Sequence, residues 1–257
     1  MWPDFLESFH RERPGITEQV IGRSQAGDLT PYQWLVEAIP TSGEVIDIAC
    51  GNGPLATLVG SRWCGADLSM SELALGVTTH ASRQVVAEAA ALPFPNAAVD
   101  IVICSMALQV LEPLSMVVAE IARVLRPGGL FVGIVPARHP LTIRDRWRYV
   151  GLIRTLHRGF ATPNDRALAR PADVMNSAGF DLLSDESRRF EYPIERPAQA
   201  EAFVSSLYST TSPRHRWRRP RRWPGVGSER RSGSRSAELS ATVRQVDRGS
   251  ADLVNQM

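Results

Sequence analysis

Segments suited to buried strands alternate with segments suited to amphipathic helices through the first half of this chain. Apolar strand-like runs cover residues 44–49, 63–69, 83–89, 99–107 and 128–137, and helical patterns lie between most of them. Such alternation requires right-handed crossovers between neighbouring parallel strands. We therefore predict an α/β fold, with a doubly wound and mostly parallel sheet covered by helices.

Helix start signals support this division of the chain. Thr30 is placed as an N-cap, with Pro31 at the first helical position and Gln33 where a capping box needs it. Ser69 and Glu72 have the same spacing, so we expect a second capping box there. The first of these helices precedes the first strand.

The composition narrows the range of functions. A net charge of +2 is close to balance, and all 29 basic residues are arginine. The three cysteines, Cys50, Cys64 and Cys104, lack paired spacing, so we expect neither disulfides nor a metal site. The N-terminus shows no apolar run after a basic start, and no eighteen apolar residues are consecutive. We therefore expect a cytoplasmic protein with no membrane partner.

Three successive strand ends carry residues that suit an adenosine ligand. Gly51 and Gly53 allow a ligand to approach the backbone, or they simply form a tight strand-to-helix turn. Asp67 can accept hydrogen bonds from both ribose hydroxyls, or it can cap the following helix. Glu88 could accept from an adenine amino group and Ala89 could donate its N–H, whereas the alternative for Glu88 is a solvated carboxylate.

The motifs "VIDIACGNG", "GADLS", "VVAEAAALPFPNAAVDIVICSMAL" and "EIARVLRPGGLFVGIVP" appear in the order and spacing of a known family. In this arrangement the chain resembles class I S-adenosylmethionine-dependent methyltransferases, especially the small-molecule group that includes ubiquinone and menaquinone methylases. The resemblance covers residues 40 to 136. It implies a Rossmann-like methyltransferase fold, S-adenosylmethionine as cofactor and a small-molecule acceptor with an O, C or N nucleophile.

The resemblance also implies roles for individual residues. Asp47 would help to anchor the methionine amine, Leu68 would pack on adenine, and Ser105 would lie near the sulfonium. Where the family has glycine this chain has Ala49, which crowds the turn slightly, and where it has aspartate this chain has Glu88. The complete expected cofactor set is Asp47, Ala49, Gly51, Gly53, Asp67, Leu68, Glu88, Ala89 and Ser105.

The resemblance suggests a methyltransferase domain over residues 1–211. Its expected parts are a helical lead-in or lid (1–39), a cofactor-binding core (40–136), an acceptor-side insert (137–170) and a C-terminal helix and strand (171–211). Phe5, Phe9, Trp147 and Tyr149 provide aromatic groups on the expected acceptor side.

The Arg/Ser/Pro-rich residues 212–257 are expected to be disordered and to lie outside the catalytic machinery. The family completes its sheet with a seventh strand, which we expect to be absent or atypical here. The stretch Leu239 to Val246 is the candidate for it.

Other functions stay open on the sequence alone. Gly51, Gly53 and Ala56 also fit the dinucleotide fingerprint of an NAD(P)-dependent oxidoreductase, although Asp67 follows it early. A missing seventh strand would favour a non-catalytic or truncated methyltransferase-like protein. The segment "RHRWRRPRRW" could bind nucleic acid, but base-methylase motifs are missing and we expect no such partner.

The sequence assigns no catalytic residue. His139 is a candidate general base, with an ordinary loop histidine as the alternative, and His10 could belong to the lid. The acceptor, the methylated atom and the oligomeric state cannot be read from the sequence.

Overall fold

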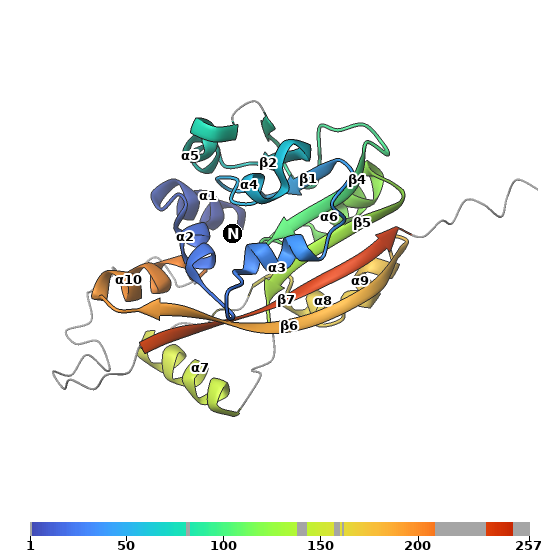
Figure 1. Ribbon diagram of the computed structural model, residues 1–257. Coiled ribbons are helices and arrows are strands. Elements are labelled where there is room, and N and C mark those ends of the chain that lie inside the picture. Colours follow the sequence, from blue (N-terminus) through green and yellow to red (C-terminus); the bar gives the residue numbers. More distant parts are fainter. Residues whose placement is uncertain are drawn as a thin grey trace, which may run out of the picture.

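The fold is known from a computed structural model. It describes residues 2–80, 83–137, 143–156, 160, 162–208 and 235–248. Within these residues one seven-stranded sheet has the order β3-β2-β1-β4-β5-β7-β6, and helices lie on both of its faces (Figure 1). The strands are β1 (Val45–Ile48), β2 (Trp63–Asp67), β3 (Gln84–Val86), β4 (Val99–Ser105), β5 (Leu125–Pro136), β6 (Phe180–Ile194) and β7 (Arg235–Arg248).

The first five strands are mutually parallel, as predicted. Asp47 pairs with Gly65 of β2 on one side and with Ile103 of β4 on the other. This register brings the carboxyl ends of β1, β2 and β4 to one edge of the sheet, where parallel α/β sheets bind ligands. The order of the strands, with β1 flanked by β2 and β4, is that of a Rossmann-like fold.

The helices are short, and those after the strands form the crossovers. Ten α-helices and one 3₁₀ helix lie in the described residues: α1 (Trp2–Glu12), α2 (Ile16–Arg23), α3 (Pro31–Glu37), α4 (Ala56–Val59), η1 (Gly60–Arg62), α5 (Met70–His80), α6 (Leu114–Val124), α7 (Ile143–Leu156), α8 (Asp165–Leu168), α9 (Pro171–Asn176) and α10 (Pro197–Ser206). None of the helices that the structure describes is long and apolar enough to cross a membrane.

Two apolar layers hold the helices to the sheet. On one face Ile46 and Ile48 of β1 and Phe131 of β5 pack against α6, α8 and α9. On the other face α3 packs Trp34 and Leu35 on β1, β4 and β5. Alternate residues of each central strand enter opposite layers, as the period of two in a strand requires. The central strands β1, β4 and β5 are therefore buried on both faces, which explains their near-continuous apolar sequences.

The seventh strand is present. Residues 235–248 form β7, which lies between β5 and β6 and is antiparallel to both (Figure 1). The expectation that residues 212–257 are disordered is therefore wrong for this stretch, which includes the candidate Leu239 to Val246. Composition had suggested disorder, but pairing on both sides satisfies the backbone of β7 and closes the open edges of β5 and β6. Residues 212–234 and 249–257 lie outside the described part.

The N-terminal helices lie near the carboxyl ends of the strands. The Thr30 capping box is confirmed, since the Thr30 hydroxyl accepts from Gln33 N and Gln33 accepts from Thr30 N. Ahead of it, Val20 of α2 packs with Tyr192 of β6 and Phe203 of α10. These contacts fix α2 between the sheet and α10.

Candidate functional site

The turn after β1 has three residues with positive φ. They are Ala49 (52°), Gly51 (56°) and Gly53 (78°). Glycine adopts this backbone freely, whereas alanine there costs roughly 1–2 kcal/mol. The positive φ explains why the related family has glycine at position 49. In this chain, the crowding expected at Ala49 takes the form of backbone strain.

Asp67 joins the ends of β1 and β2. Its carboxylate accepts from Gly51 N at 2.8 Å and from Ser69 N at 2.7 Å. Burial raises the pKa of Asp67, and these two hydrogen bonds partly offset the increase. Each oxygen accepts one of these bonds, so each keeps a lone pair for a further donor. The helix-capping and ligand-binding alternatives for Asp67 are therefore compatible.

Asp47 lies beneath the turn rather than at its surface. Its side chain is buried, and its Oδ2 accepts from the Trp63 indole at 3.0 Å. Burial raises the pKa of Asp47 to about 8. The other oxygen, Oδ1, is enclosed and has no hydrogen-bond partner in the described residues. A buried, half-satisfied carboxyl of this kind is a polar group that a ligand, or water bound with one, could complete.

The remaining predicted residues surround the same edge of the sheet. Ser105 ends β4 two residues beyond Ile103, the partner of Asp47, and its Oγ is enclosed without a partner in the described residues. Leu68 is 66% exposed beside Asp67, so its side chain is available for contact with a ligand. Glu88 is exposed and Ala89 half-buried, just beyond β3. The structure thus places all nine residues at or near the carboxyl ends of the neighbouring strands β3, β2, β1 and β4.

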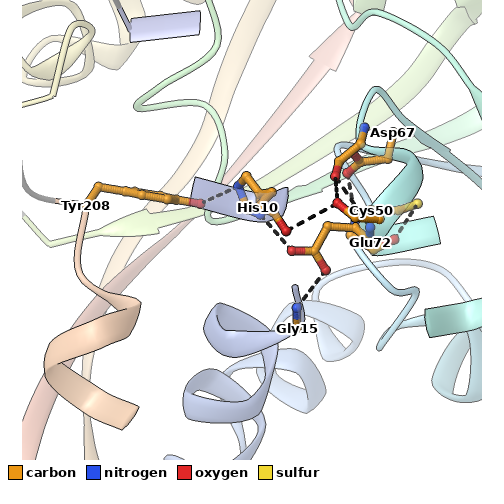
Figure 2. A network of polar contacts seen from close by, with 9 residues as sticks. His10, Gly15, Cys50, Asp67, Glu72 and Tyr208 are labelled. Atoms are coloured by element: carbon orange, nitrogen blue, oxygen red, sulfur yellow. Dashed lines mark hydrogen bonds and ion pairs between the residues drawn. The ribbon is translucent and has the colours of Figure 1, made fainter. Parts of the chain in front are cut away.

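The N-terminal helices, expected from the sequence as a lead-in or lid, reach the same edge through contacts that the sequence did not reveal. Figure 2 shows His10 pointing toward Glu72 of α5, with Tyr208 on its other side. His10 Nδ1 lies 2.7 Å from Glu72, whose second oxygen accepts from Gly15 N at 2.8 Å. Burial lowers the pKa of His10, but the hydrogen bond and the charge of Glu72 outweigh it, so the pKa is raised.

The second capping box is only half present. Glu72 N donates to Ser69 Oγ at 3.4 Å, but the Glu72 carboxylate turns away to His10 and Gly15. The local spacing of Ser69 and Glu72 could not reveal a partner 62 residues earlier in the chain. The sequence signal for the contact between Glu72 and the N-terminal helices is the Pro14-Gly15 pair. Gly15 has a φ of 73° and forms the turn between α1 and α2.

Glu18 of α2 is the second group that sequence reasoning missed. Its carboxylate lies so close to Gly51 that a Cβ at Gly51 would clash with Glu18 Oε1. Its other oxygen, Oε2, is enclosed and has no partner in the described residues. Burial, followed by the negative charge of Glu72, raises the pKa of Glu18 to about 7.

The acceptor side is only partly described. His139 lies outside the described residues. Trp147 of α7 is 70% exposed, while Phe9 is buried in the N-terminal segment. Asn164 donates to the carbonyls of Leu108 and Leu111, which anchors the end of the insert beside β4.

Two cavities lie in the described part of the chain. A cavity of about 60 Å³ lies beside Gln109, Pro136 and Thr162, at the carboxyl end of β5. A larger hollow of about 780 Å³ lies between α6 and α9, and none of the predicted site residues lines it.

Part of the chain is similar to known methyltransferases. A family described as a methyltransferase domain matches residues 46–133. Malonyl-[acyl-carrier protein] O-methyltransferase of Alcanivorax borkumensis is 28% identical over 205 residues, which are 76% of this chain and 64% of the relative. That of Hahella chejuensis is 35% identical over 97 residues, 35% of each protein. Residues 46–133 therefore match a methyltransferase domain.

The fold comparison agrees with this domain assignment. The solved structure of an S-adenosylmethionine-dependent methyltransferase from Methanosarcina mazei covers 86% of this chain and 99% of its own, at 14% identity and a TM-score of 0.52. The chain spans between about a third and just under two thirds of the two curated relatives. The comparisons give the NAD(P)-dependent alternative no support, and β7 removes the reason for regarding the domain as truncated.

The residues of the methyltransferase domain fit a cationic adenosine cofactor. The Glu18 carboxylate takes up the space at Gly51 that a Cβ would fill, and Glu18, Asp47 and Ser105 keep enclosed oxygens without partners in the described residues. The negative charges of Glu72 and Asp67 raise the pKa of Glu18, and those of Asp67 and Glu18 raise the pKa of Asp47. His10, whose pKa is raised, faces Glu72 and carries a positive charge when it is protonated. An excess of carboxylates favours a ligand with positive charge.

Proposed function

We propose that this protein transfers a methyl group from S-adenosylmethionine to a small-molecule acceptor. The observation that carries the proposal is the bond from Gly51 N to Asp67, because it brings the glycine turn and the acid that suits a ribose to one place. The family match over residues 46–133 supports the same function.

We assign the individual residues the roles that the resemblance implies, and their positions at the strand ends support this assignment. Asp67 accepts from the ribose hydroxyls, and the exposed Leu68 packs on adenine, whose edge Glu88 and Ala89 contact. Gly51 and Gly53, with Ala49, lie under the methionine and ribose portion. Asp47 anchors the methionine amine, and Ser105 lies toward the sulfonium.

The cofactor supplies an activated methyl group on its sulfonium when bound. The protein then needs to orient the acceptor in line with the methyl carbon and to exclude water. Orientation of this kind contributes up to roughly 7–11 kcal/mol in well-arranged systems. We assign this work to the lead-in of residues 1–39 and the insert of residues 137–170, around the core of residues 40–136. Residues 171–211 and β7 complete the sheet.

The acceptor class and the compartment are part of the same proposal. The relatives from Alcanivorax borkumensis and Hahella chejuensis are both described as malonyl-[acyl-carrier protein] O-methyltransferases. Acceptors with a carboxyl group, either as free acids or as part of a thioester conjugate, are therefore the first to screen. We place the protein in the cytoplasm, because Cys50, Cys64 and Cys104 are all free thiols.

Isothermal titration with S-adenosylhomocysteine, and separately with NAD(P), tests the cofactor. We expect one molecule of S-adenosylhomocysteine bound per chain and no heat from NAD(P). Incubation of acceptor libraries with methyl-labelled cofactor, followed by mass spectrometry, then identifies the acceptor. Binding of NAD(P) without S-adenosylhomocysteine would refute the proposed function.

A further inference from the structure

The Glu18 carboxylate occupies an unusual position for a charged group. It projects from α2 onto the backbone of Gly51, in the space that only a residue without Cβ leaves open. Oε2 is enclosed and unpartnered among the described residues, and the neighbouring ionisable groups include Glu72 and Asp67, both acidic. A largely enclosed carboxylate beside other carboxylates destabilises the protein unless it takes up a proton or a positive charge joins it.

His10 does not fill this role. Its Nδ1 is directed to Glu72 at 2.7 Å, and the Tyr208 hydroxyl lies 3.3 Å from its other nitrogen (Figure 2). Both ring nitrogens are therefore engaged away from Glu18. His10 therefore acts on Glu18 only through its charge, and a cationic ligand beside Gly51 would supply the direct partner that Oε2 lacks.

The proposed cofactor has that charge. S-adenosylmethionine has a sulfonium and an ammonium against one carboxylate, so its net charge is positive, whereas the product S-adenosylhomocysteine has lost the sulfonium and is neutral overall. A carboxylate beside the methionine portion distinguishes the two by charge.

Building on the proposed function, we propose that Glu18 is a further cofactor-binding residue, whose carboxylate pairs with the sulfonium end of S-adenosylmethionine. As a result the protein binds the methyl donor more tightly than the demethylated product. A lid residue thereby contributes to cofactor selection, which the strand-end motifs do not by themselves provide.

Calorimetric titration of Glu18→Gln tests the proposal, because glutamine keeps the shape and removes the charge. We expect the dissociation constant for S-adenosylmethionine to rise at least tenfold, and that for S-adenosylhomocysteine to rise by no more than about threefold. Glu201→Gln, at an exposed position of α10, is the matched control and should leave both constants unchanged.

Each other outcome has a defined meaning. Unchanged affinity for S-adenosylmethionine in Glu18→Gln would overturn the proposal, and so would an equal loss for both ligands, since the carboxylate would then pair with a group common to both. If the wild-type protein binds neither ligand, the proposed function fails instead. Circular dichroism of Glu18→Gln confirms that the variant is folded before titration.

Discussion

Replacing Glu18 by glutamine should stabilise the protein without cofactor, even though it weakens cofactor binding. In the folded state burial and the charge of Glu72 raise the pKa of Glu18 from its ordinary 4.5 to about 7. The folded protein therefore binds this proton more tightly than the unfolded chain does. The stabilisation from this proton is fully present below pH 4.5 and is lost as the pH rises through 7.

The difference between the two pKa values sets the magnitude. At about 1.4 kcal/mol per pH unit, it corresponds to at most about 3.5 kcal/mol lost by the wild-type protein above pH 7. Partial exposure of the residue and coupling to Glu72, His10 and Asp67 reduce the expected value to about 1–2 kcal/mol. Glutamine does not titrate, so Glu18→Gln avoids this loss.

Urea unfolding of the cofactor-free protein, followed by circular dichroism at pH 5 and pH 8, measures the effect. The free energy of unfolding of Glu18→Gln, minus that of the wild type, should become more positive by about 1–2 kcal/mol between the two pH values. Glu201→Gln should show no such change. A difference that is independent of pH, or that becomes more negative at pH 8, would refute the reasoning, because the carboxylate would then be well solvated or already paired.

Three further predictions concern the cofactor turn and the sheet. Asp67→Asn should weaken S-adenosylhomocysteine binding at least tenfold by calorimetry, since a charge-assisted hydrogen bond contributes about 1.5–3 kcal/mol; an unaltered constant would remove Asp67 from the site. Ala49→Gly should raise the free energy of unfolding by about 1 kcal/mol in urea, because φ is 52° there; a loss of stability would contradict the strain. A chain ending at residue 234 lacks β7, so it should lose cooperative thermal unfolding, whereas a retained transition would show β7 to be dispensable.

Local pattern was sufficient for the parallel half of the sheet. The alternation of apolar runs and amphipathic helices predicted β1 to β5, and the residues that follow each strand predicted where the cofactor set would gather. This works because strand period, helix caps and glycine turns depend on residues a few positions apart. The Thr30 capping box is confirmed for the same reason.

Pairing between distant segments was not predictable in this way. β7 comes from a stretch whose surroundings are rich in arginine and serine, and its strand character depends on two long neighbours, β5 and β6, that complete its backbone hydrogen bonds. The local composition around β7 carries no information about β5 and β6, which lie far away in the sequence.

By itself, the sequence determined the fold class, the parallel core and the glycine turn with Asp67, because each is encoded in short-range spacing. Only the tertiary structure decided that α1 and α2 lie over that turn, that Glu72 faces His10 rather than its own helix start, and that Glu18 reaches Gly51. These contacts join residues 33 to 62 positions apart. No local periodicity encodes them, since they depend on how separate helices pack on the finished sheet.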